Sequence, residues 1–381
     1  MSSAADRLRL ARAEGVGPVT YRRLLRRYGT PVAALDALPA LAQAGGRSAP
    51  LAVPSPEAAE REIERVHRLH GRLLYLGEPD YPPLLALLDD APPVLTVLGD
   101  LAALAGPAVA LVGSRNASAN GRRMAERLAE DLAASLVVVS GLARGVDGAA
   151  HAGALRAGRT VACVAGGIDV PYPPEHAVLQ ARIAESGAVV SEAPPGTAPQ
   201  ARHFPRRNRV IAGLSLGVVV VEAALRSGSL ITARLAQDAG RELFAVPGSP
   251  LDPRNRGSNG LIRQGAHLVE RVEDVLENLP DHPAREGLGR LPLFVHGPPP
   301  EASASPEALQ PPPPPAAAEV ALARAQVVDL LGPAPTAVDD LIRCCQLSAS
   351  AVMSVLLELE IAGRVETLPG NRVAMLVEAG R

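Results

Sequence analysis

The sequence predicts an α/β protein with a Rossmann-like, doubly wound, mostly parallel sheet, flanked by a small N-terminal helical domain and a C-terminal winged-helix domain. Three observations support this fold class. Between residues 107 and 276, short apolar runs alternate with amphipathic helical patterns, which is typical of a parallel sheet. Residues 6–70 show helical periodicity only. Beyond residue 318, three helical patterns are followed by a hairpin pattern.

The strands of the sheet are predicted from buried apolar runs. Between the first two runs, Met124, Leu128 and Leu132 recur four residues apart and predict one apolar face of a helix. The repeated alternation of strand and helix indicates crossover connections. The predicted strands are 108–112, 136–140, 160–164, 188–191, 218–222 and 243–246.

Four segments follow from these patterns. Residues 1–70 are expected to form a helix-hairpin-helix or SAM-like domain, and residues 71–281 the Rossmann-like domain. Prolines recur over residues 282–318, with five in succession at 311–315, which predicts a semi-rigid linker. Residues 319–381 are expected to form the winged helix.

Composition narrows the functional classes. The formal net charge of the 381 residues is -2, and every basic side chain is arginine, so a nucleic-acid surface requires local clustering of charge. The three cysteines, Cys163, Cys344 and Cys345, fit neither a disulfide framework nor a zinc site. With no secretory pattern and no apolar run that could span a bilayer, the sequence predicts a cytoplasmic location without membrane contact.

Glycine-rich segments follow the strands at the sheet edge where ligands bind in this fold class. The first strand ends in Gly113-Ser114-Arg115, and the second runs into glycines that flank Arg144. Small residues and helix N-termini favour a bound anion. Because both the G-x-G-x-x-G fingerprint and the lysine-containing phosphate loop are missing, no nucleotide cofactor is expected.

A short run contains Phe204 beside Arg206, Arg207, Asn208 and Arg209. It combines phosphate-binding charge, hydrogen-bond donors and one aromatic face, which single-stranded nucleic acid requires. In the alternative interpretation, Phe204 packs in the core and the arginines form a solvated helix start. These residues alone leave both interpretations open.

Acidic and histidine side chains raise the question of catalysis. Asp147 and His151 lie one helical turn apart, which predicts a local pair, and no catalytic residue or metal site is expected. Glu222, at a strand end, suggests an alternative function, a Rossmann-like nucleotide-binding hydrolase. We interpret Glu222 instead as a hydrogen-bonding partner of nearby backbone amides.

Together these motifs resemble the DNA-processing protein A (DprA/Smf) family over residues 81–276. The resemblance implies a protein that binds single-stranded DNA entering during natural transformation, protects it and loads the RecA recombinase. It also implies a homodimer through the Rossmann-like domain, and it allows a single-strand-binding protein as a further partner. The implied strand-binding residues are Ser114, Arg115, Phe204, Arg207 and Asn208, with Gly113, Arg144, Arg206 and Arg209 as neighbours. The matching motifs are Gly113-Ser114-Arg115, the segment 140–147 with Ala150-His151, Phe204-Pro205 with 207–213, and Glu222-Ala223 with 227–230.

Each flanking domain carries a separate hypothesis. Gly15 and Gly17, followed by Arg22 and Arg23, resemble a helix-hairpin-helix element that makes an auxiliary DNA contact. A helical domain that only packs against the rest of the protein fits equally well.

The winged helix is acidic. From residue 319 onward the sequence has five arginines and eight acidic residues, a net charge of -3, and the expected recognition helix 348–362 has no arginine. This predicts a protein-interaction or regulatory role for the winged helix.

Overall fold

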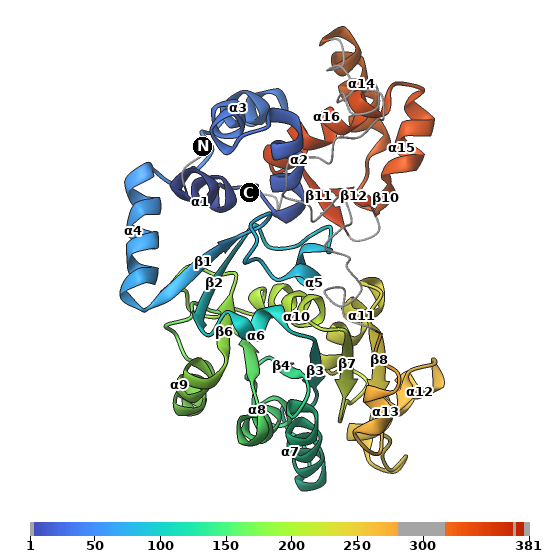
Figure 1. The fold of residues 1–381 in the computed structure, drawn as a ribbon. Coiled ribbons are helices and arrows are strands. Elements are labelled where there is room, and N and C mark those ends of the chain that lie inside the picture. The colour runs from blue at the N-terminus through green and yellow to red at the C-terminus, as the bar shows by residue number, and fades with distance from the viewer. Residues whose placement is uncertain (1–3, 281–316, 369–370, 377–381) are drawn as a thin grey trace, which may run out of the picture. The chain divides into compact units, whose positions relative to one another are not determined.

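A computed structural model describes residues 4–280, 317–368 and 371–376. The chain divides into two compact units, which we name the terminal unit (residues 1–60 and 297–381) and the central unit (residues 61–296) (Figure 1). The predicted linker 282–318 lies almost wholly outside the described residues. The three boundaries between the four predicted segments therefore stay a prediction.

The central unit contains a mostly parallel sheet, as the sequence predicted. Within the described residues the sheet has nine strands in the order β1-β2-β6-β5-β4-β3-β7-β8-β9. Only the β1–β2 and β2–β6 pairs are antiparallel. The strands are β1 (Gly71–Tyr75), β2 (Val94–Gly99), β3 (Ala108–Val112), β4 (Val137–Ser140), β5 (Thr160–Cys163), β6 (Ala188–Ser191), β7 (Gly217–Val220), β8 (Glu242–Ala245) and β9 (His267–Leu268).

Strand order reverses in the middle of this sheet. From β3 the chain adds β4, β5 and β6 on one side and later adds β7, β8 and β9 on the other. The carboxyl ends of β3 and β7 therefore border the topological switch point, where doubly wound sheets bind ligands. The remaining elements of the unit are α5 (Pro83–Ala86), α6 (Ala102–Ala105), α7 (Ala119–Ala133), α8 (Val146–Ala157), η1 (Pro174–His176), α9 (Ala177–Ser186), α10 (His203–Leu214), α11 (Ser229–Asp238), η2 (Pro253–Asn255), α12 (Arg256–Arg263) and α13 (Glu273–Leu276), while α4 (Pro56–Arg68) leads into β1.

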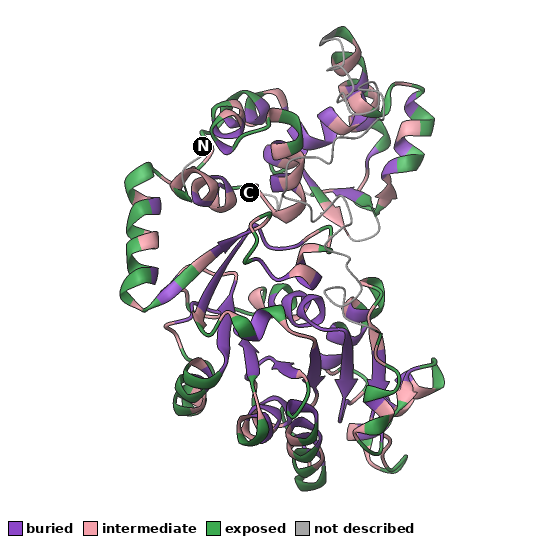
Figure 2. Cartoon of the chain, in the orientation of Figure 1, coloured by how far each residue is buried: buried purple, intermediate pink, exposed green. Residues whose placement is uncertain are grey.

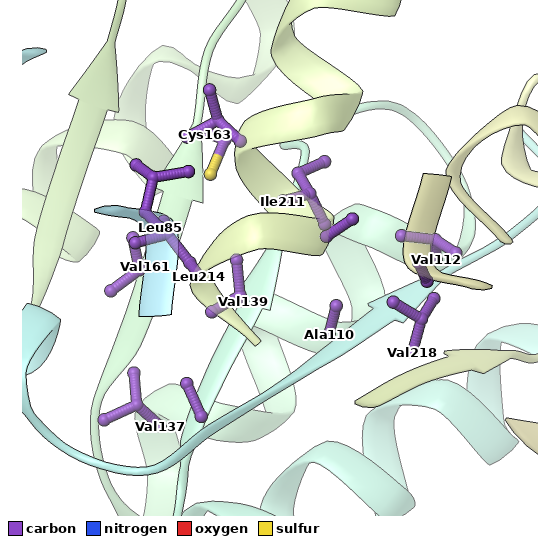
Figure 3. Close-up of a cluster of buried hydrophobic side chains, with 14 of the residues drawn as sticks. Leu85, Ala110, Val112, Val137, Val139, Val161, Cys163, Ile211, Leu214 and Val218 are labelled. Carbon is purple, nitrogen blue, oxygen red and sulfur yellow. The ribbon is translucent and has the colours of Figure 1, made fainter. Parts of the chain in front are cut away.

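Helices cover both faces of the sheet (Figure 1). Alternate residues of β3 point to opposite sides, so that Ala110 and Val112 pack with α10 while Val109 and Leu111 pack with α7 and α8. Figure 3 shows the first of these cores, in which Ile211 and Leu214 of α10 lie over valines of the strands. The strands are buried almost throughout (Figure 2), so the sheet is a rigid platform for the loops at its ends.

The terminal unit combines the two ends of the chain. Leu357 and Ile361, from the predicted recognition helix, share one core with Leu10, Leu24 and Leu38 of the N-terminal helices. The helical domain and the winged helix thus pack together. The described elements are α1 (Ala4–Arg12), α2 (Pro18–Tyr28), α3 (Pro31–Ala44), α14 (Ala317–Leu330), β10 (Thr336–Ala337), α15 (Val338–Cys345), α16 (Ala349–Ile361), β11 (Val365–Leu368) and β12 (Arg372–Met375).

Close backbone contacts seal this packing. A Cβ atom at Gly45 would lie 2.1 Å from the carbonyl oxygen of Glu358, and one at Gly15 would lie 3.1 Å from that of Ile361. Glycine lets the two chain ends approach this closely because it has no side chain. Across the described part of the chain, no helix is both long and apolar enough to cross a membrane.

Candidate nucleic-acid interface

Three hollows meet at Arg115, at the carboxyl ends of the central strands. The switch-point hollow has a volume of about 670 Å³ and lies between the segments that follow β3 and β7. A small aromatic hollow of about 60 Å³ contains Phe204 and Tyr172. The third, an open groove of about 700 Å³, is lined by the first residues of α7 and α8. Arg115 lines all three, so they are neighbours, and we refer to them together as the depression.

Phe204 lies at the wall of this depression rather than in the core. The ring is half-buried. The Cζ atom of Arg115 lies 4.9 Å and that of Arg207 5.7 Å from its centroid, both within cation–π range. The ring of Tyr172 meets it edge-on at 5.8 Å. Phe204 is therefore held in place and partly accessible, as a stacking surface for a base requires.

The turn after β3 fixes the position of Arg115. The N–H of Val146, the first residue of α8, donates to the carbonyl of Ser114 at 3.2 Å, and the Ser114 hydroxyl accepts from the N–H of Asn116. A Cβ atom at Gly113 would lie 2.6 Å from the side chain of Val146. The predicted Gly-Ser-Arg segment thus packs tightly on α8 and presents an exposed Arg115.

Arg207, which the sequence predicted as a strand contact, is mostly buried. Its side chain is 6% exposed, and its Nη1 lies 3.9 Å from a carboxylate oxygen of Asp147. Burial raises the pKa of the Asp147 carboxyl, and the nearby guanidinium opposes that shift. Arg207 lines the aromatic and switch-point hollows, and its guanidinium lies within cation–π range of Phe204, so the residue supports that ring. The sequence carried a signal for this burial, because Arg207, Val210, Ile211 and Leu214 share one face of α10.

The other two arginines of the run, Arg206 and Arg209, differ in burial and in their contacts. The guanidinium of Arg209 is buried and pairs with Glu192 at 2.7 Å and with Asp90 at 3.4 Å. Arg206 is exposed but lines none of the three hollows described above. Asn208 lines the switch-point hollow together with Gly113 and Ser114. The structure therefore brings Asn208 to the depression and uses Arg209 as a structural ion pair.

Arg144 also lies at the depression, but it is paired. Its side chain is exposed and forms a hydrogen-bonded ion pair with Glu175. This contact raises the pKa of Arg144 and lowers that of Glu175. A phosphate that binds Arg144 must compete with this carboxylate.

The groups considered for catalysis have structural partners. The carboxylate of Glu222 is buried and accepts hydrogen bonds from the backbone N–H and the hydroxyl of Ser118, the N-cap of α7. Asp147 and His151 do not form the predicted helix pair. Asp147 faces Arg207, while Nδ1 of His151 lies 2.7 Å from the hydroxyl of Thr160. In the described ranges, no cluster of three metal-binding side chains occurs.

The N-terminal residues suggested as an auxiliary contact are largely used within the terminal unit. Arg23 lies 3.5 Å from the carboxylate of Glu360, and both side chains are mostly buried. Gly15 packs against the end of α16, and Gly17 precedes α2. Arg22 is half-buried. These contacts fit the packing interpretation of the N-terminal domain.

Sequence reasoning missed several residues of the depression. Arg122 and Arg123 of α7 line the groove, Arg226 lines the switch-point hollow and Tyr172 lines the aromatic hollow. One signal was available, since Arg122 and Arg123 directly precede Met124, the first residue by which the helix was predicted. Tyr172 and Arg226 lie in loops whose course the pattern does not fix.

Comparison with known proteins places all three regions of the chain. The family of DNA recombination-mediator protein A matches residues 72–280, the DprA winged helix domain matches residues 311–371, and the DprA-like N-terminal HHH domain matches residues 2–64. Protein Smf of Escherichia coli is 42% identical over 298 residues, which cover 77% of this chain and 75% of that protein. DNA processing protein DprA of Streptococcus pneumoniae is 48% identical over 197 residues, 51% of this chain and 70% of that protein.

Two solved structures share the fold. The X-ray structure of DprA from Streptococcus pneumoniae matches with a TM-score of 0.62 at 36% identity, covering 74% of this chain and all of that one. DprA from Helicobacter pylori, described for its single-stranded DNA binding mode, matches with a TM-score of 0.50 at 31% identity, covering 56% of this chain and 99% of that one. The chain belongs to the DNA-processing protein A (DprA/Smf) family.

Proposed function

We propose that this protein binds single-stranded DNA in the depression of the central unit, protects it and loads RecA onto it during natural transformation. The observation that carries the binding step is the pairing of Arg115 with Phe204. Among the described residues Arg115 forms no ion pair, so its charge is available to a phosphate beside a partly accessible ring. The relative from Helicobacter pylori, whose structure was described for single-stranded DNA binding, supports this step.

Binding, rather than chemistry, is the proposed activity. The nucleotide-hydrolase alternative would need a free carboxylate at Glu222, but this carboxylate accepts two hydrogen bonds from Ser118. Strand contacts are proposed for Gly113, Ser114, Arg115, Phe204 and Asn208, with Arg144 and Arg206 at the margin. Arg207 and Arg209 would act by holding α10 in position.

The partners are proposed from the family resemblance. RecA and a single-strand-binding protein would meet the DNA complex in the cytoplasm, and the protein would act as a homodimer through its central unit. Large apolar side chains exposed on that unit, such as Leu251 and Leu268, provide surface for a second copy. Sedimentation at increasing concentration should show a dimer, and a monomer at every concentration would contradict this part.

A binding titration tests the main proposal. A labelled single-stranded oligonucleotide should bind more tightly than the matching duplex or a mononucleotide. Its affinity should fall with salt at a slope of about -0.7 per neutralised phosphate. Tighter binding of the mononucleotide, with release of a hydrolysis product, would instead favour the hydrolase. If the single strand, the duplex and the mononucleotide all failed to bind, the protein would be a scaffold for other proteins.

A further inference from the structure

A groove on the central unit continues beyond Arg115, away from the switch point. Residues at the start of α7 and of α8 line it, and its volume is about 700 Å³. It shares Arg115 and Arg144 with the aromatic hollow, so a strand that passes Phe204 meets the groove directly. The sequence motifs assign a role to Arg115 and Arg144 of this surface, but none to the residues of α7 that line it.

The groove has an excess of positive charge. Its lining contains four arginines, Arg115, Arg122, Arg123 and Arg144, and one acidic residue, Glu126. The carboxylate of Glu126 pairs with Arg156, which lies outside the lining, and Arg144 pairs with Glu175. Within the described residues, Arg115 and Arg122 have no acidic partner, and Arg123 bonds only to the neutral side chain of Asn120. Arg115, Arg122 and Arg123 thus have no ion-pair partner in the part of the chain that the structure describes.

The floor of the groove is made of small residues. Gly145 and Gly148 belong to it, with Ala119 and Ala149 beside them. At Gly145 the backbone has φ +77°, and a Cβ atom would lie 2.3 Å from the carbonyl oxygen of Ser114. At Gly148 a Cβ atom would lie 2.8 Å from the ring of His176. Because four of the ten lining residues have no side chain or only a methyl group, an extended backbone can approach the arginines.

The first amides of α8 are not the source of attraction. The N–H groups of Val146, Gly148 and Ala149 already donate to the carbonyls of Ser114, Ala143 and Gly145. Asp147 of the same turn is buried beside Arg207 and does not line the groove, although its charge also acts on Arg115. The arginine side chains therefore dominate its electrostatics.

We propose that the α7–α8 groove is a second phosphate-backbone subsite, which extends the path of a single strand beyond Arg115 through contacts with Arg122 and Arg123. This inference rests on the proposed function, because it assumes a strand at Phe204. It predicts that occupancy of the groove depends on oligonucleotide length. A strand of about 4 nucleotides fills the first site only, whereas one of about 16 nucleotides reaches the groove, within the range of site sizes for single-strand binders.

The test compares the double variant Arg122→Ala, Arg123→Ala with a matched control, Arg127→Ala. Arg127 lies on α7, is 84% exposed, and lines none of the three hollows. With the longer oligonucleotide, the double variant should bind several times more weakly than the wild type. Its salt slope should be shallower by about 0.7 for each lost contact. The shorter oligonucleotide and the Arg127→Ala variant should behave as the wild type.

Three outcomes would contradict the proposal that the groove is a phosphate-backbone subsite. In the first, the double variant keeps the wild-type salt slope with the longer strand. In the second, it weakens the binding of both lengths equally. In the third, Arg127→Ala weakens binding as much as the double variant does, which would reveal only a net-charge effect. The Arg115→Ala variant, measured in parallel, separates this from the main proposal. If Arg115→Ala weakens both lengths while the double variant changes nothing, the groove fails and the function stands. If Arg115→Ala also changes nothing, the proposed function fails.

Discussion

The two units of this protein differ in whether their arginines are paired with acidic side chains and in whether their helices are accessible to a ligand. In the central unit, the turn after β3 leaves Arg115 exposed and without an acidic partner among the described residues. In the terminal unit, Arg23 pairs with Glu360 and Arg324 pairs with Glu358, and α16 is covered by the N-terminal helices. A winged helix that reads duplex DNA needs that helix free to enter a groove.

The comparison teaches that basic residues in a DNA-binding family are not interchangeable contacts. Arg23 follows a helix-hairpin-helix pattern and Arg115 follows a strand, so each has a DNA-binding interpretation in the sequence. The side chain of Arg23 is 14% exposed and lies beside a buried carboxylate. Burial raises the pKa of Glu360, and Arg23 opposes that shift. Arg23 therefore stabilises a packed interface, while Arg115 stays free for a ligand.

The largest expected effect comes from opening the terminal unit. Gly45→Val places a side chain where a Cβ atom would lie 2.1 Å from the carbonyl oxygen of Glu358. Overpacking against a backbone that cannot give way should destabilise the unit by about 3 kcal/mol. Helix α16 contributes to two cores of this unit, one shared with the N-terminal helices and one that contains Cys345. Displacement of α16 should therefore loosen the packing around Cys345.

The cysteines provide the measurement. Cys345 is buried in the terminal unit, Cys163 is buried in the central unit, and Cys344 is exposed. Burial raises the pKa of Cys163 to about 12, so its thiol reacts only when the structure opens. Thiol labelling of Gly45→Val should speed up at Cys345 and stay unchanged at Cys163. Gly332→Ala, with no atom within 4 Å of the added Cβ, is the control. Equal acceleration at both cysteines would show that the units do not open independently.

The next effect is on binding. Arg115→Ala removes the phosphate-binding charge and the cation contact at 4.9 Å from the ring of Phe204. A charged hydrogen bond contributes about 2 kcal/mol, so the dissociation constant for a single strand should rise roughly thirtyfold. Fluorescence anisotropy with a labelled oligonucleotide at fixed salt measures the change.

Arg23→Ala is the counterpart in the terminal unit. It leaves the buried carboxylate of Glu360 without its ion pair and should lower stability while leaving the affinity for single-stranded DNA unchanged. A loss of affinity in Arg23→Ala as large as that in Arg115→Ala would erase the contrast between the two units.

Much of the central fold was predictable because its parallel strands are buried on both faces. Such strands read as continuous apolar runs, and all six predicted runs correspond to β3–β8 within one or two residues at each end. The antiparallel strands β1 and β2 were not predicted. Exposed Arg72 interrupts the first, and the second precedes residue 107, where the alternation of strand and helix patterns begins.

The candidate site was predictable where it depends on local position. Gly113-Ser114-Arg115 follows a strand, and that alone places it at the sheet edge. The burial of Arg207 was predictable in part, from its place on the apolar face of α10, but its partner Asp147 comes from another helix. The closure of the terminal unit was beyond reach, because Arg364 and Gly45, whose atoms meet there, are 319 residues apart in the sequence. Contacts of this kind leave no periodic pattern.

A smaller effect is expected for the aromatic surface. Phe204→Ala should weaken single-strand binding by about 1.5 kcal/mol, in the lower half of the range for a stacked base, because Tyr172 and two arginines already cover part of the ring. The salt slope should not change, since no charge is lost. A shallower slope in titrations at several salt concentrations would mean that Phe204 acts by positioning Arg115.

The smallest effect concerns the pH dependence of the central unit. His151 is fully buried, and its Nδ1 faces the hydroxyl of Thr160. That hydroxyl donates its proton to the carbonyl of Val138, so His151 must donate through Nδ1–H, and its Nε2 has no partner among the described residues. Burial, with smaller contributions from His176 and Arg207, lowers the pKa of His151 to about 3.

The sign of the pH effect follows from these two protonation states. Between pH 6.5 and about 3 the unfolded chain binds a proton at His151 and the folded chain does not, so stability falls as the pH falls through this window. At pH 5.5 the loss is about 1.4 kcal/mol. His151→Asn keeps a donor for Thr160 but cannot titrate, so its calorimetric melting temperature should fall less between pH 7 and pH 5.5 than that of the wild type. Parallel curves for the two proteins would show that His151 is protonated in the folded state, and would thereby refute the neutral, Nδ1-donating form on which this prediction depends.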